Sequence, residues 1–170
     1  MKLNAQNIDK DIFMLYNMFG WRKLEMIQRP EYLNTLISFK DKDLIKVVTG
    51  IRRCGKSTLF DLYSNYLREE GIEDNQIIKI NLEESEYHHL DTYLKLAEYV
   101  IWKLNPDKQN YVFLDEVQTV PEFQKACDSL YIKKNIDLYI TGSNAYILSG
   151  ELSTLLSRKI YRNKNDAIIF

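Results

Sequence analysis

From residue 30 onward, short apolar runs alternate with longer segments whose apolar side chains recur at helical spacing. The short runs are typical of buried strands, and the longer segments are typical of amphipathic helices. We therefore expect strands at residues 44–48, 77–82, 111–114 and 137–141. We expect helices at about residues 30–39, 59–70, 91–104 and 121–134, with Pro30 and Pro121 opening two of them and Gly71 ending one.

This alternation predicts an α/β fold. Nearly continuous apolar strands are buried on both faces, so we expect a parallel sheet sandwiched by helices. The chain has 170 residues, which is enough for a single core. We assign residues 29–170 to that core. Residues 1–28 lack clean periodicity and are assigned to an N-terminal arm.

Composition narrows the class of protein only slightly. Lys and Arg total 23 against 24 for Asp and Glu, so overall charge gives no reason to expect nucleic acid or an anionic membrane as a partner. No apolar run approaches the roughly 18 residues of a membrane span. Two cysteines, Cys54 and Cys127, are too few for a disulfide framework. A cytoplasmic protein without a membrane partner is expected.

Residues 50–57 read Gly-Ile-Arg-Arg-Cys-Gly-Lys-Ser and match the pattern G-x-x-x-x-G-K-[ST]. The segment lies between a predicted strand and a predicted helix, where its backbone N–H groups can surround a phosphate. Lys56 is expected to contact the β- and γ-phosphates of ATP, and Ser57 to ligate Mg²⁺. The expected nucleotide-binding residues are Gly50, Ile51, Arg52, Arg53, Cys54, Gly55, Lys56, Ser57 and Thr58.

Other readings of this loop stay open. Arg52 and Arg53 would help to neutralise phosphate or would be solvated loop charges. Cys54 has cationic neighbours that favour a reactive thiolate, but a passive place in the loop is the preferred interpretation.

Asp115 and Glu116 directly follow the most apolar predicted strand. The carboxyl ends of parallel strands meet at one edge of a sheet, so both acids are expected beside the phosphate loop. Asp115 would hold Mg²⁺ through a water, and Glu116 would activate an attacking water. The alternative is an acidic strand end that only caps a turn. Ser143 and Asn144 follow the next strand and are candidates for contacting the γ-phosphate, or are simply turn residues.

Three segments together resemble a known family: residues 47–59 (VVTGIRRCGKSTL), 113–118 (FLDEVQ) and 139–146 (YITGSNAY). They are similar to the prokaryotic AAA-superfamily P-loop ATPases that usually carry a C-terminal, nuclease-like domain. The resemblance covers roughly residues 27–158. It implies a Walker A loop, a Walker B pair at Asp115 and Glu116, and a sensor-one position at Ser143-Asn144. It also implies that the strand ending at Ser143-Asn144 lies between the strand that leads into the Walker A loop and the strand that ends at the Walker B pair.

The resemblance weakens toward the C-terminus. Arg158 falls where these proteins have a Gly-Arg pair, which makes it a candidate arginine finger acting on a neighbouring subunit. The family's glycine is missing before Arg158, and residues 159–170 depart from the pattern. A secure fifth core strand, the helical lid and the C-terminal domain are not found, so a truncated member is expected. A homo-oligomer or protein partner, and nucleic acid, are implied by the family only.

The leading hypothesis is Mg²⁺-dependent ATP hydrolysis, with Lys56, Glu116, Asn144 and Arg158 as catalytic residues. Two alternatives are kept. One is a nucleotide-binding switch or interaction module with little hydrolysis, since the parts that commonly close the site are not found. The other is a small-molecule kinase, which the same loop permits but the acidic pair disfavours.

Overall fold

The computed structural model describes residues 30–51, 54–143 and 168–169. The predicted N-terminal arm therefore lies outside the described residues. The helices are α2 (Pro30–Ser38), α3 (Lys56–Glu69), α4 (Tyr93–Lys103) and α5 (Phe123–Tyr131). The strands are β1 (Lys46–Gly50), β2 (Ile77–Asn81), β3 (Asn110–Asp115), β4 (Ile136–Ser143) and β5 (Ile168–Ile169). Short 3₁₀ turns are η1 (Asp74–Gln76), η2 (Ser85–Tyr87) and η3 (Val117–Thr119).

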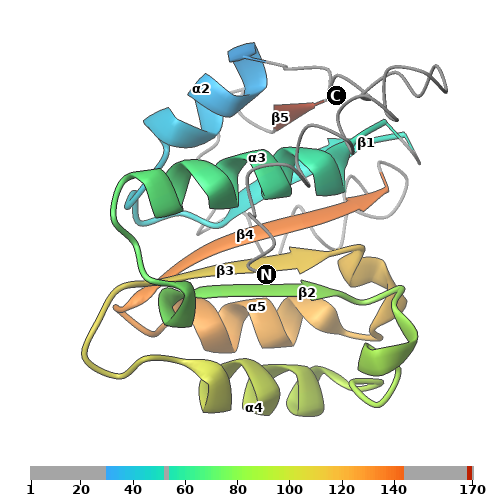
Figure 1. Cartoon of the computed structure of the whole chain (residues 1–170). Helices are drawn as coiled ribbons and strands as arrows, with labels where there is room; N and C mark the ends of the chain where they lie inside the picture. The colour runs from blue at the N-terminus through green and yellow to red at the C-terminus, as the bar shows by residue number, and fades with distance from the viewer. Residues whose placement is uncertain (1–29, 52–53, 144–167, 170) are drawn as a thin grey trace, which may run out of the picture. The chain divides into compact units, whose positions relative to one another are not determined.

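The strands form one parallel sheet in the order β2-β3-β4-β1-β5 (Figure 1). The predicted α/β fold with a parallel sheet is confirmed. β4 pairs with β1 on one side and with β3 on the other. The strand order implied by the resemblance is therefore present, with the strand that leads to Ser143 between the two motif-bearing strands.

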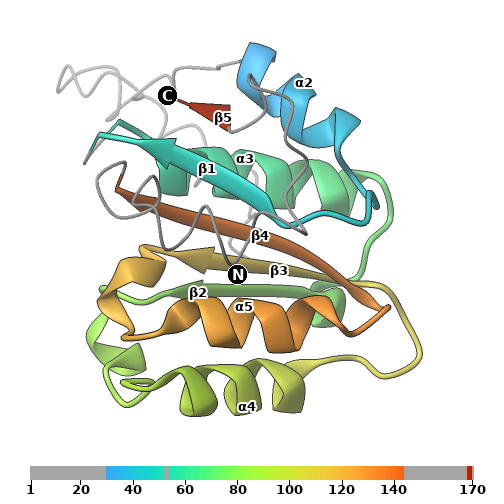
Figure 2. The ribbon, with the colours of Figure 1, turned by 180° about the vertical axis from the view of Figure 1, so that it is seen from behind.

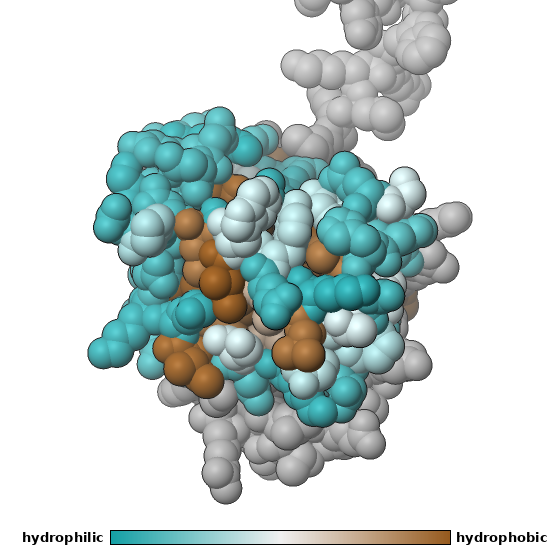
Figure 3. All heavy atoms as spheres, turned by 90° about the horizontal axis from the view of Figure 1, so that it is seen from below, coloured by the Kyte–Doolittle hydropathy of each residue, from teal (hydrophilic) through white to brown (hydrophobic). Residues whose placement is uncertain are grey.

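Helices cover both faces of the sheet, as Figures 1 and 2 show from opposite sides. Side chains alternate along each strand, so Tyr111 and Phe113 of β3 join the core beneath α2 and α3, whereas Val112 and Leu114 join the core beneath α4 and α5. The predicted sandwich is therefore confirmed. Figure 3 looks onto the α4 and α5 layer, where apolar side chains are scattered among hydrophilic ones.

Most predicted boundaries hold to within two or three residues. α3 ends as expected before Gly71, whose φ of 88° lets its N–H and that of Ile72 bond to the carbonyls of Arg68 and Leu67. α5, however, begins at Phe123 and not at Pro121, because Glu122 adopts a left-handed conformation with φ 54°. β5 is a further difference: Ile168 and Ile169 pair with β1, although no secure fifth strand was expected.

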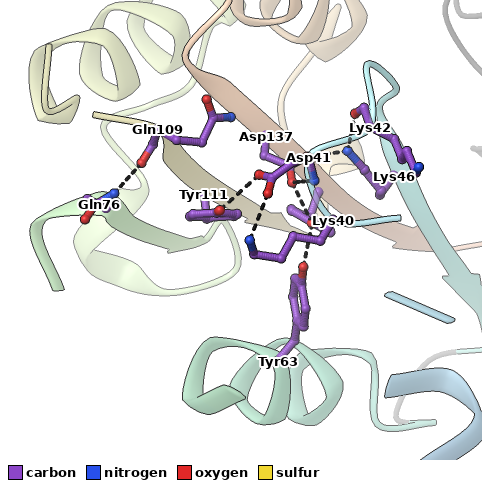
Figure 4. Close-up of polar contacts among 10 residues, drawn as sticks. Lys40, Asp41, Lys42, Lys46, Tyr63, Gln76, Gln109, Tyr111 and Asp137 are labelled. Carbon is purple, nitrogen blue, oxygen red and sulfur yellow. Dashed lines mark hydrogen bonds and ion pairs between the residues drawn. The ribbon is translucent and has the colours of Figure 1, made fainter. Parts of the chain in front are cut away.

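A buried polar network joins the elements at the amino-terminal edge of the sheet (Figure 4). Asp137 of β4 forms an ion pair with Lys46 of β1, and both side chains are at most 2% exposed. Asp137 also accepts hydrogen bonds from the backbone N–H of Asp41 at 2.9 Å and from the hydroxyl of Tyr139 at 2.8 Å. The loop after α2 and the beginnings of β1 and β4 are thereby held together.

Two tyrosines extend the same network to neighbouring elements. The hydroxyl of Tyr111 in β3 donates to Asp41 at 3.0 Å, and the hydroxyl of Tyr63 in α3 lies 2.9 Å from that of Tyr139. The three central strands are therefore fixed to one another, and to α3, at the edge opposite the predicted nucleotide site.

Burial and pairing act in opposite directions on the ion pair. Burial lowers the pKa of Lys46 and raises the pKa of Asp137, while their mutual attraction opposes both shifts. Breaking such a pair on one side leaves an uncompensated charge in a poorly solvated position.

We expect Lys46→Met to lower the free energy of unfolding by about 3–5 kcal/mol, because Asp137 would stay buried without its cation. Lys79→Met is the matched control, since Lys79 is also a strand lysine paired with an aspartate, Asp61, but that pair is 39% and 52% exposed. Its loss should cost no more than about 1 kcal/mol. Urea unfolding of both variants measures the difference, and equal losses would contradict a special role for the buried pair.

Candidate nucleotide-binding site

The predicted site residues converge at the carboxyl-terminal edge of the sheet. Gly50 is the last residue of β1 and Asp115 is the last residue of β3. β4 runs between them, with Gly50 opposite Ser143 and Leu114 opposite Ile140. Because all three strands are parallel, the phosphate loop and the acidic pair lie at the same edge, one strand apart.

The structure describes Ile51, Cys54 and Gly55 of the loop between β1 and α3. Ile51 is 72% exposed, and its carbonyl accepts a hydrogen bond from the N–H of Cys54 at 3.3 Å. Gly55 takes φ 95°, which is strained for any residue with a side chain, and precedes the first residue of α3. As the N-cap residue, Gly55 has no side chain with which to cap the first N–H groups of α3, and a helix start of this kind suits an anion. Arg52 and Arg53 lie outside the described residues.

Lys56 and Glu116, predicted to act on the same phosphate, are in direct contact. Lys56 Nζ lies 3.2 Å from Glu116 Oε1, with side-chain exposures of 2% and 12%. The same ammonium donates to the carbonyl of Ile51 at 3.4 Å. Partial burial strengthens this attraction relative to an exposed pair. The contact brings a cation and a carboxylate to one point at the mouth of the loop.

Thr141 joins the two acids and was not singled out from the sequence. Its hydroxyl donates to Asp115 Oδ1 and accepts from the N–H of Glu116 at 2.9 Å. The side chain is fully buried at the end of β4, one register step beyond the Leu114–Ile140 pair. Sequence reasoning favoured the residues two and three positions later; Ser143 is the last residue of β4, and Asn144 lies outside the described residues.

The turn after β3 holds the carboxylate of Glu116 from a second side. Glu116 has φ 55° and ψ 50°, a left-handed conformation that is uncommon for a residue other than glycine. The amide of Gln118 donates to Glu116 Oε2 at 2.6 Å, and the hydroxyl of Thr119 donates to the Glu116 carbonyl at 3.0 Å. Both carboxylate oxygens of Glu116 are therefore engaged.

The two predicted metal ligands line one pocket of about 210 Å³. Ser57 of α3 and Asp115 of β3 line it together with Asn81 and Glu84. Such a set of oxygen donors suits Mg²⁺, which prefers carboxylates, hydroxyls and waters. Thr58 is half-buried in the first turn of α3. Arg158 lies outside the part of the chain that the structure describes.

A strand that ends in a glycine-containing phosphate loop, with an acidic pair on the next strand but one of a parallel sheet, defines a P-loop nucleotide-binding domain. Comparison with known families agrees, since residues 42–164 match the family described as AAA domain. The chain belongs to this AAA domain family, which places it among the ATP-binding P-loop ATPases.

A curated relative shares this region. An uncharacterized protein of Haemophilus influenzae (strain ATCC 51907 / DSM 11121 / KW20 / Rd) is 44% identical over 133 residues. The match covers 78% of this chain and 33% of the relative, so the chain spans about a third of the relative's length. Among the helices in the described ranges, none has the length and apolar character needed to cross a bilayer.

Replacing Thr141 by the isosteric valine should lower the free energy of unfolding by about 1–3 kcal/mol, because the N–H of Glu116 and an oxygen of Asp115 would lose their shared partner. Thr35→Val is the control, since the described hydrogen bond of the Thr35 hydroxyl is an exposed one, to the carbonyl of Glu31 in the same helix. Its effect should stay within about 0.5 kcal/mol. A Thr141→Val variant as stable as the control would contradict the bridging role.

The two cysteines should differ sharply in reactivity. Cys127 is a fully buried residue of α5, and burial raises its pKa to about 12, so the thiolate is scarce at mildly alkaline pH. Cys54 is half-buried in the phosphate loop. A chromogenic thiol reagent should label Cys54 in the native protein and both thiols in urea. The Cys54→Ser variant should resist labelling until it is unfolded; fast native labelling of that variant would contradict the burial of Cys127.

Proposed function

We propose that this protein hydrolyses ATP in a Mg²⁺-dependent reaction, with Glu116 as the base that activates water. The observation that carries the proposal is the contact between Lys56 and Glu116 at the mouth of the phosphate loop. A lysine at the position of Lys56 binds phosphate oxygens in P-loop proteins, and a carboxylate such as that of Glu116 is suited to take a proton from water. We therefore propose that the γ-phosphate of bound ATP lies beside these two side chains.

Phosphate binding would change the partner of Lys56. The N–H groups at the start of α3 would hold the β-phosphate, and the Lys56 ammonium would turn from Glu116 to the phosphate oxygens, which offer more negative charge. Ser57 and Asp115 would hold Mg²⁺, which neutralises charge on the β- and γ-phosphates when bound. The carboxylate of Glu116 would then be released from its cation and free to accept a proton.

The proposed reaction is an in-line displacement. The oxygen of a water attacks the γ-phosphorus while Glu116 takes one of its protons. The bond from the γ-phosphorus to the bridging oxygen breaks, and the products are ADP and inorganic phosphate. Asn144 is proposed to contact the γ-phosphate or the water. Arg158 is proposed to reach the nucleotide of a neighbouring subunit, which would require a homo-oligomer.

Lys56→Ala should weaken binding of a fluorescent ATP analogue at least about 10-fold, because a charge-assisted contact to phosphate is lost. Glu116→Gln should keep the analogue's Kd within a few-fold of wild type but lower the rate of phosphate release by about 100-fold or more. Both are measured with and without Mg²⁺.

Glu122→Gln is the matched control for the second variant. Glu122 has the same left-handed backbone, with φ 54° against 55°, but its carboxylate pairs with Lys125 on the surface. Its turnover should equal that of wild type. Unchanged turnover in Glu116→Gln would refute the assigned base. Binding without phosphate release by wild type would favour a nucleotide-binding switch, and transfer of phosphate to a metabolite in preference to water would favour a kinase.

A further inference from the structure

We propose that Gln118 is a positioning residue for Glu116, a role that rests on the proposed hydrolysis of ATP. Gln118 Nε2 donates to Glu116 Oε2 at 2.6 Å, while Lys56 occupies Oε1 at 3.2 Å. The two contacts are on different oxygens and come from different elements. One belongs to the phosphate loop and its helix, and the other belongs to the same turn as Glu116.

The two contacts should respond differently to ATP. Phosphate oxygens compete with Glu116 for the ammonium of Lys56, so the contact at Oε1 is exchanged on binding. They do not compete for Gln118, whose amide lies on the opposite oxygen. Among the side-chain contacts that the structure describes, the Gln118 amide is thus the one that stays on the Glu116 carboxylate during the reaction. Its hydrogen bond would keep Oε1 directed toward the position that Lys56 leaves.

The turn η3 gives Gln118 a fixed place from which to act. Val117, the preceding residue, is fully buried. The N–H of Thr119 donates to the Glu116 carbonyl at 3.1 Å, and the N–H of Val120 donates to the Val117 carbonyl at 3.1 Å. These two hydrogen bonds fix the backbone of the turn after Glu116. The Gln118 side chain is thereby held two residues from Glu116, within reach of its carboxylate.

The orientation of the Gln118 amide favours a role in positioning over a role in stability. Exchanging its oxygen and nitrogen would place two oxygens 2.6 Å apart, so the donor must face Glu116. The amide oxygen is then buried without a hydrogen-bond partner in the described part of the chain. If Gln118 served only to stabilise the fold, an arrangement that gave this oxygen a hydrogen-bond donor would be more stable, because an unpaired buried acceptor is destabilising.

The first test compares Gln118→Met and Gln118→Glu with wild type in phosphate release and ATP-analogue binding. Gln118→Met removes the donor at similar size, and kcat should fall about 10- to 100-fold while the Kd changes less than about 3-fold. Gln118→Glu adds a like charge beside Glu116, and kcat should fall further. Thr119→Ala is the matched control, because the described hydrogen bonds of Thr119 go to the backbone carbonyl of Glu116 and not to its carboxylate; its kcat should stay within about 2-fold.

A double-mutant cycle separates positioning from a structural effect. In the Glu116→Gln background, Gln118→Met should not lower the residual rate further, because the carboxylate on which it acts has gone. A full additional loss would overturn the proposal, as would an unchanged kcat in Gln118→Met. If Gln118→Met does not fold, Gln118→Leu removes the same donor on another apolar side chain, and wild-type kcat in that variant would likewise overturn it.

The failures of the two proposals are distinguishable. If wild type binds the analogue but releases no phosphate, the hydrolytic function falls and the role of Gln118 falls with it. If wild type releases phosphate and Glu116→Gln does not, but Gln118→Met matches wild type, the role of Gln118 alone is overturned.

Discussion

The site depends on the insertion of β4 between β1 and β3. Neighbouring strands lie roughly 5 Å apart, so the loop after β1 and the acidic end of β3 are separated by roughly 10 Å of sheet. That interval leaves room for a phosphate group, yet Lys56 and Glu116 are long enough to meet across it. Direct pairing of β1 with β3 would close the gap. The intervening strand also supplies Thr141, whose hydroxyl bonds to the side chain of Asp115 and the backbone of Glu116.

The two edges of the sheet differ in whether their buried polar groups have hydrogen-bond partners. At the amino edge, the described polar groups around Asp137 satisfy one another through the contacts with Lys46, Asp41 and Tyr139. At the carboxyl edge, two buried polar oxygens, Thr49 Oγ1 and Gln118 Oε1, have no partner among the described residues. The first arrangement fixes the strands, and the second leaves polar groups near the place where a ligand is expected. Rigidity and binding are thus assigned to different ends of the same strands.

The sequence predicted what depends on local pattern. Apolar runs located β1 to β4, Gly71 located the end of α3, and the phosphate-loop residues located the turn before α3. The order of the strands came from the family resemblance, since an apolar run does not specify its neighbours.

Contacts between residues far apart in the chain had no signal in the sequence. Asp41 and Asp137 are 96 positions apart and form a hydrogen bond, and the sequence analysis favoured later polar residues over Thr141. Pro121 suggested a helix start, which the left-handed Glu122 moves to Phe123. Gln118 lay inside a quoted motif, but only the turn η3 brings its amide to Glu116.

The left-handed backbone of Glu116 has a consequence for how this protein can vary. Glycine or asparagine would adopt φ 55° at lower cost than glutamate, so the residue proposed to activate water carries a backbone cost that those residues would avoid. In a chain that no longer needs to hydrolyse nucleotide, replacement of Glu116 by glycine or asparagine would relieve this backbone cost and raise the stability of the fold. Glu122 has the same backbone conformation without a proposed chemical role, so it supplies the reference: a glutamate kept at 116 among divergent copies in which residue 122 varies would indicate continuing selection for chemistry.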